Sequence, residues 1–178
     1  MLARDYNFHH LVTGDLIRSL RAEGEKNPFA KEVKELYDRG VPQPDHVANK
    51  LVFDELDRIP IEKNLIFDTY PLSLGQAATL EEFYSLNKGS YHHPVIVYFH
   101  ISEEEAVKRL MMRQMKEHRT DDKEQIIRFR YREYAKRMVE LESFFKPHKR
   151  FIQIDGTPSI EEIYQTLQGE LSAHHLLP

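Results

Sequence analysis

The chain has 178 residues, of which 40 % are hydrophobic and 30 % charged, and its net charge is −4 at pH 7. These values are ordinary for one globular domain with a core, and they exclude a general electrostatic attraction to nucleic acid or to an anionic membrane. The absence of cysteine excludes disulfides, thiol catalysis and cysteine-bound zinc. Charges begin at Arg4 and apolar runs stay short, so we expect no signal peptide, no membrane span and a cytoplasmic location.

Short apolar runs rich in β-branched and aromatic residues predict strands at 8–12, 64–68, 94–101 and 150–155. Helical patterns separate them. Ser73 with Gln76, and Ser102 with Glu105, have the spacing of a capping box at a helix start. Strands that alternate with helices predict an α/β fold with a mainly parallel sheet, and ligands bind such sheets at the carboxyl ends of the strands.

A long helix is expected after Asp121 or Asp122, either of which can cap it. Apolar residues recur along it at spacings of three and four, as on a helix face that packs against a core. This stripe consists of Ile127, Tyr131, Tyr134, Met138, Leu141 and Phe145.

Polar residues follow the first two predicted strands. Thr13, Gly14 and Asp15 suit a helix start, and Arg18 lies one turn into that helix, within reach of a phosphate near its amino end. Asp68 ends the second strand, where a carboxylate is either a ligand for metal or water, or a cap for the adjoining turn. Both readings remain open from these residues alone.

A cluster of arginines lies between the third and fourth strands. Arg109 and Arg113 share one helix face, five residues of loop length separate Arg113 from Arg119, and Arg130 lies near the apolar stripe. Arginines from two helices and their loop converge only around an anion, and the guanidinium fork suits phosphate. The alternative is a solvated helical hairpin whose arginines pair with nearby carboxylates. We expect Arg128 to be solvated in either case.

Several motifs in order resemble the adenylate kinase (nucleoside monophosphate kinase) family: "TGDLIR", "GVPQPDHV", "LIFDTYPLSLGQA", "RLMMRQMKEHRTDDKEQIIRFRYREY" and "IDGTPSIEEI". The resemblance covers nearly the whole chain. It implies a P-loop-kinase-like parallel sheet flanked by helices, in a single domain over residues 1–178. Within it, residues 14–43 would form a helical insert that binds the acceptor nucleotide, and residues 113–119 a short lid.

The resemblance also implies the reaction ATP + AMP = 2 ADP, with Mg²⁺ bound to ATP, in a monomer that binds neither nucleic acid polymers nor membranes. Zinc is not expected, because a long zinc-bearing lid is excluded and the histidine pairs lack metal-ligand spacing. The catalytic arginines would be Arg113, Arg119 and Arg130, oriented by Asp121 and Asp122. The acceptor nucleotide would be bound by Thr13, Gly14, Arg18, Val41, Pro42, Gln43, Tyr70, Gln76, Arg119 and Arg130. ATP would be bound by Arg113, Thr157 and Pro158, and Asp68 would hold waters of the Mg²⁺.

The sequence departs from the family pattern in two places. Leu72 stands where the family has an arginine on the acceptor phosphate, which leaves UMP or CMP as an alternative acceptor. The chain also lacks the first, central strand and the GxxxxGK[ST] phosphate loop that follows it. Their absence should leave a gap between the strands at 64–68 and 94–101. We expect an N-terminally truncated kinase, and the alternative is a non-catalytic nucleotide-binding module.

Overall fold

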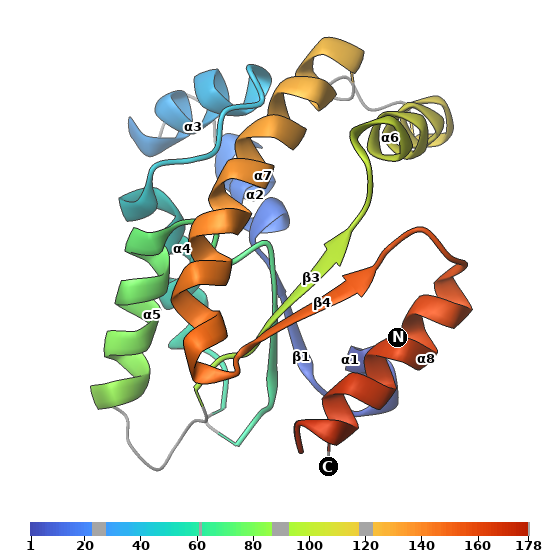
Figure 1. Ribbon diagram of the computed structural model, residues 1–178. Coiled ribbons are helices and arrows are strands. Elements are labelled where there is room, and N and C mark those ends of the chain that lie inside the picture. Colours follow the sequence, from blue (N-terminus) through green and yellow to red (C-terminus); the bar gives the residue numbers. More distant parts are fainter. Residues whose placement is uncertain (23–27, 61, 87–92, 118–122, 178) are drawn as a thin grey trace.

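The computed structural model describes residues 1–22, 28–60, 62–86, 93–117 and 123–177 (Figure 1). It is an α/β structure, as the alternating pattern predicts. The strands are β1 (His9–Val12), β2 (Leu65–Asp68), β3 (Ile96–His100) and β4 (Phe151–Asp155). Each lies inside one of the four predicted strand ranges, so these predictions are confirmed.

The strands pair as two separate two-stranded parallel sheets within the described residues. β1 pairs with β2 in the register Val12↔Asp68, and β3 pairs with β4 in the register His100↔Asp155. β2 and β3, the strands on either side of the expected gap, share no ladder in the described part of the chain. The expected break in the sheet is therefore confirmed, and each of these strands keeps one hydrogen-bonding edge without a strand partner there.

Helices surround these strands: α1 (Leu2–Asp5), α2 (Thr13–Ala22), α3 (Pro28–Asp38), α4 (Asp45–Leu56), α5 (Leu74–Leu86), α6 (Glu103–Glu117), α7 (Glu124–Phe145) and α8 (Ile160–Ala173). A short 3₁₀ turn, Lys146–His148, follows α7. In Figure 1, α3, α4 and α5 lie on one side of the molecule, and α8 lies on the other side beside β4. No helix among the described residues is long and apolar enough to span a membrane.

Both predicted helix starts are present. The hydroxyls of Ser73 and Ser102 accept hydrogen bonds from the backbone N–H groups of Gln76 and Glu105, at 3.1 and 3.2 Å. Each hydroxyl satisfies one of the N–H groups that a helix leaves free in its first turn.

Two boundary predictions around the arginine cluster are wrong. α6 continues to Glu117, so residues 114–117, expected to be loop, are helical. The N-cap position of α7 is Lys123 rather than either aspartate, and it makes no side-chain capping bond. Asp121 and Asp122 themselves lie outside the described residues. The sequence did not show where this helix ends. The charged and polar residues after Arg113 are good helix formers at exposed positions, and they are equally common in loops.

The core follows the predicted apolar faces. Leu11 of β1 packs with Val52 of α4 and Leu80 of α5 in one cluster, and Ile152 and Ile154 of β4 pack on α8 in another. The predicted stripe of α7 is confirmed, because three of its members are buried and the other three partly buried. Each large apolar side chain buried in this way contributes about 1.5–3 kcal/mol.

Glu103, in the first turn of α6, ties α6 to α7. Its carboxylate accepts hydrogen bonds from Arg128 Nη1 at 3.1 Å and from Arg132 Nε and Nη2 at 3.2 and 3.1 Å. Hydrogen bonds from Arg132 and Arg128 lower the pKa of Glu103. Arg128 is still 35 % exposed, as a solvated side chain would be, but its pair with Glu103 was not predicted. Its partner is 25 positions away in sequence, beyond the reach of helical spacing rules.

Candidate active site

The residues predicted to bind the acceptor include two buried polar side chains, each with one oxygen that has no hydrogen-bond partner among the described residues. Thr13, the first residue of α2, is 4 % exposed, and Gln43, just before α4, is 8 % exposed. The amide nitrogen of Gln43 donates to the carbonyl of Val33 at 3.3 Å. Thr13 Oγ1 and Gln43 Oε1 have no hydrogen-bond partner among the described residues. Buried polar atoms are normally satisfied, and an ordered water or a bound ligand would satisfy these two.

Arg18 lies folded back over the start of α2. It pairs with Asp15 and makes a hydrogen bond with Tyr37 of α3. A Cβ built on Gly14 would lie 3.2 Å from Arg18 Nη1, so the glycine leaves room for the guanidinium. The guanidinium of Arg18 is therefore near the amino end of α2, as expected, and its remaining N–H donors could bind a phosphate.

Gly40, just after α3, packs against α7. It ends α3 with φ of +70°, and Val41 N donates to Leu36 O at 3.0 Å, the bond of a glycine-capped helix terminus. A Cβ on Gly40 would lie 2.6 Å from Ile126 Cγ2 and 2.9 Å from Arg130 Cγ. The stem of Arg130 thus contacts the residue that immediately precedes the predicted base-lining segment 41–43.

Gln76 and Tyr70 form a buried polar network. Gln76 Oε1 accepts from Leu72 N at 2.6 Å, and its Nε2 donates to Asp45 Oδ1 at 3.0 Å. The Tyr70 hydroxyl donates to Asn49 Oδ1 at 2.8 Å, and burial, with a smaller effect of the Asp45 charge, raises the pKa of Tyr70. Gln76 is thus hydrogen-bonded inside the protein through both its oxygen and its nitrogen.

Asp68 is exposed at the carboxyl end of β2, as predicted. Its Oδ1 accepts from the hydroxyl of Thr69 at 2.8 Å, and its Oδ2 lies 3.6 Å from His10 Nε2 of β1. Among the described residues, no group of three or more acidic or histidine side chains is arranged to hold a metal ion. One carboxylate nevertheless fits Mg²⁺, which usually keeps several waters and takes its other ligands from substrate phosphates.

Arg109 of α6 is hydrogen-bonded to the turn between β4 and α8. Its Nη1 donates to Gly156 O at 2.7 Å, its Nη2 to Thr157 O at 3.0 Å, and its Nε to Glu105 Oε1 at 2.6 Å. The sequence motifs imply no role for Arg109. The available signal was its spacing of four from Arg113, which places both on one face of α6.

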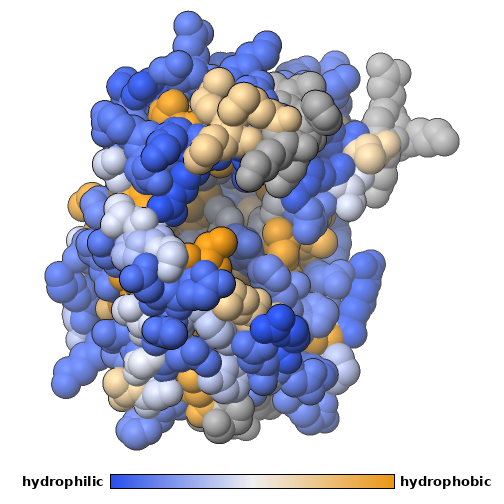
Figure 2. Space-filling view, turned by 90° about the vertical axis from the view of Figure 1, so that its right-hand side faces the viewer, coloured by the Kyte–Doolittle hydropathy of each residue, from blue (hydrophilic) through white to orange (hydrophobic). Residues whose placement is uncertain are grey.

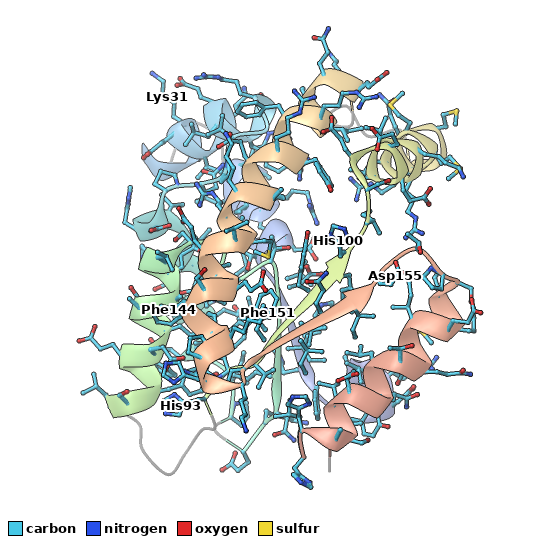
Figure 3. The ribbon with its side chains drawn as sticks, in the orientation of Figure 1. Lys31, His93, His100, Phe144, Phe151 and Asp155 are labelled. Carbon is cyan, nitrogen blue, oxygen red and sulfur yellow. The ribbon has the colours of Figure 1, made fainter. Side chains whose placement is uncertain are left out.

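The turn itself is ordered by Asp155. Thr157 donates from its backbone N–H to Asp155 Oδ1 at 2.9 Å and from its hydroxyl at 2.8 Å. The backbone bond, then the hydroxyl bond, lowers the pKa of Asp155, with a smaller contribution from His100. Figure 3 shows His100 and Asp155 at the adjoining carboxyl ends of β3 and β4. Thr157 and Pro158 follow on the exposed side of this turn.

The structure therefore assembles the predicted residues in two groups. The residues predicted to bind the acceptor lie on α2, α4, α5, α7 and the segments beside them, and the residues predicted to border ATP lie on α6 and in the β4–α8 turn. Arg113 is half-buried on α6, whereas Arg119, Asp121 and Asp122 lie outside the described residues. Figure 2 shows a hollow at mid-height on the face that carries α6 above and α8 below, with hydrophobic residues around it.

Comparison with known proteins shows which family this chain resembles. A family model described as adenylate kinase matches residues 1–150. An adenylate kinase of Flavobacterium psychrophilum is 34 % identical over 168 residues, covering 93 % of this chain and 86 % of that protein. An adenylate kinase of Leptospira biflexa is 31 % identical over 94 % of this chain and 88 % of that protein. An adenylate kinase of Thermus thermophilus is 29 % identical over 96 % of this chain and 87 % of that protein.

Proposed function

Since the chain belongs to the adenylate kinase family and is a nucleoside monophosphate kinase, we propose that its acceptor is AMP and its reaction ATP + AMP = 2 ADP. The observation that carries this proposal is the contact of Arg130 with Gly40. An acceptor nucleotide extends from its base to its phosphate, so base-lining and phosphate-binding residues must adjoin. The contact joins the segment 41–43 to an arginine of the predicted phosphate-binding set.

Buried polar atoms support an acceptor site in the same region. Thr13 Oγ1 and Gln43 Oε1 lack partners among the described residues, and a nucleotide or its ordered water would satisfy them. Arg18 would bind the acceptor phosphate, and Gln76 would bind the base. The remaining contacts would come from Gly14, Val41, Pro42 and Tyr70.

The proposed chemistry needs positioning and positive charge rather than a protein nucleophile. Phosphoryl transfer develops negative charge on the peripheral oxygens, and Arg113, Arg119 and Arg130 would stabilise it, with Asp121 and Asp122 orienting them. One such arginine contributes about 10³-fold or more in rate. On the donor side, the Thr157–Pro158 turn would border the adenine of ATP. Mg²⁺ bound with ATP would neutralise charge on its phosphates, and Asp68 would hold its waters.

Leu72 favours a second candidate for the acceptor. An arginine at this position in the family contacts the acceptor phosphate, and leucine offers neither charge nor hydrogen bond. UMP or CMP is therefore the alternative acceptor. The proposal also includes a monomer located in the cytoplasm, as the family resemblance implies, and gel filtration of the purified chain tests the monomer.

The proposal is tested by titrating the chain with AMP, UMP and CMP in a calorimeter, and by assaying ADP formation from ATP and each acceptor in a form that also carries the family's first strand and GxxxxGK[ST] loop. We expect AMP to bind best and to give the fastest turnover. Arg130→Ala should reduce turnover at least 10³-fold. Arg132→Ala, two positions along the same helix and 66 % exposed, is the matched control and should change turnover little. Preference for UMP or CMP would reject the AMP assignment, and binding without turnover would indicate a non-catalytic module.

A further inference from the structure

Arg137 of α7 lies against the loop that carries Leu72. Its Nη1 donates to Leu72 O at 3.1 Å, across 65 positions of sequence, and the side chain is half-buried. This loop runs from the end of β2 to the start of α5, and it contains the position where the family has its acceptor-phosphate arginine. The guanidinium of Arg137 thus lies at the backbone of Leu72, the residue that replaces the family's arginine.

Arg137 makes no ion pair with any described residue. Arg137 lines a cleft of about 360 Å³. Three carboxylates line this cleft with it, namely those of Asp45, Glu133 and Glu140. Asp45 accepts from Ser73 and Gln76, and Glu133 pairs with Lys136 at 2.7 Å. The only hydrogen bond of Arg137 in the described part of the chain is to a neutral carbonyl, which leaves most of its five N–H donors for an anion.

The helix places Arg137 in line with Arg130. The two residues are seven positions apart, which is two turns, so they project from the same face of α7 and are about 10 Å apart along its axis. The side-chain stem of Arg130 lies at Gly40 with its guanidinium over the Tyr134 ring, and the guanidinium of Arg137 lies at Leu72. A phosphate near the Leu72 loop would therefore lie on the face of α7 that carries both Arg130 and Arg137.

We propose that Arg137 supplies, at the acceptor phosphate, the positive charge that position 72 lacks. This inference rests on the proposed function, because it concerns the acceptor site of that reaction. It explains how a chain with leucine at position 72 binds a monophosphate. The competing role is purely structural: Arg137 would only tie α7 to the loop through its bond to the Leu72 carbonyl.

The test measures the affinity of the chain for AMP and for adenosine, which differ only by the phosphate. Arg137→Gln keeps a hydrogen-bond donor for the carbonyl but removes the charge. It should weaken AMP binding about 10-fold to 100-fold and leave adenosine binding unchanged. Lys146→Gln, outside this cleft and 70 % exposed, removes the same charge and should leave both affinities unchanged. Adding Leu72→Arg to Arg137→Gln should restore AMP affinity.

Two outcomes overturn the inference alone. In the first, Arg137→Gln binds AMP as tightly as the wild type. In the second, it loses AMP and adenosine affinity equally, melts at a lower temperature and is not rescued by Leu72→Arg, which shows the structural role. A wild-type chain that binds no monophosphate overturns the proposed function, and the inference falls with it. The wild-type titration separates that failure from the other two.

Discussion

Arg109→Ala should both destabilise the protein and weaken ATP binding. The substitution removes two hydrogen bonds from a charged donor to the carbonyls of Gly156 and Thr157, at 2.7 and 3.0 Å. Each contributes about 1 kcal/mol at a partly exposed site, or about 2 kcal/mol together. The pair with Glu105 adds little, because both side chains are substantially exposed, at 37 % and 28 %. For a chain of this size the melting temperature should fall by about 4–8 °C.

The effect on ATP follows from the position of the turn. Without Arg109, the turn at Gly156 and Thr157 loses its connection to α6 and must be ordered again when the nucleotide binds. Ordering one residue of backbone costs about 1–2 kcal/mol, so ATP affinity should fall about 5-fold to 30-fold. AMP affinity should stay the same, because the acceptor residues lie on other elements.

Thermal unfolding followed by circular dichroism gives the stability change, and calorimetric titration gives the two affinities. Lys108→Ala is the matched control, since Lys108 precedes Arg109, is 68 % exposed and lies 3.8 Å from the same Glu105 carboxylate. Arg109→Ala with an unchanged melting temperature would refute the anchoring of the turn. A lower melting temperature with unchanged ATP affinity would refute the link between the turn and the donor site.

Three further predictions concern other parts of the molecule. Gly40→Ala forces its Cβ to within 2.9 Å of Arg130 Cγ, so turnover of active enzyme should fall about 10²-fold. Gly169→Ala, with open space around it, is the control, and equal turnover in both variants would show that the contact does not position Arg130. The lowered pKa of Glu103 means that its ion pairs stabilise the fold above the unfolded value of 4.5, and that this stability is lost as pH falls through the lower folded value. Glu103→Gln should therefore unfold more easily than wild type at pH 7 but equally at acid pH, and a pH-independent difference in urea unfolding would contradict this. Leu141→Ala removes a fully buried side chain and should cost about 2–5 kcal/mol in urea unfolding, whereas a cost below about 1 kcal/mol would indicate a loosely packed α7.

Strand and helix positions were predictable because they depend on short-range pattern. The apolar runs at 64–68, 94–101 and 150–155 predict strands, and each contains one. The spacing of Ser73 and Gln76 correctly predicts the start of α5. Backbone preferences and side-chain periodicity act over a few residues, so these features can be read from neighbouring positions alone.

Helix boundaries around the lid were harder to predict. The sequence pattern suggests a loop after Arg113, but α6 continues to Glu117. Polar residues are compatible with both states, and whether the last turn forms depends on what packs beside it. Capping by Asp121 or Asp122 failed for a similar reason, since α7 begins one to two residues later than its charge pattern suggested.

The motif order already identified the candidate arginines, but their contacts depend on residues far away along the chain. Arg130 meets Gly40 across ninety positions, Arg109 meets Gly156 across 47, and Arg137 meets Leu72 across 65. Such contacts arise when separate helices pack against the core, and no local pattern specifies which faces will meet. The residue types could therefore be recognised in the sequence, whereas the contacts that these residues make are decided by packing between elements.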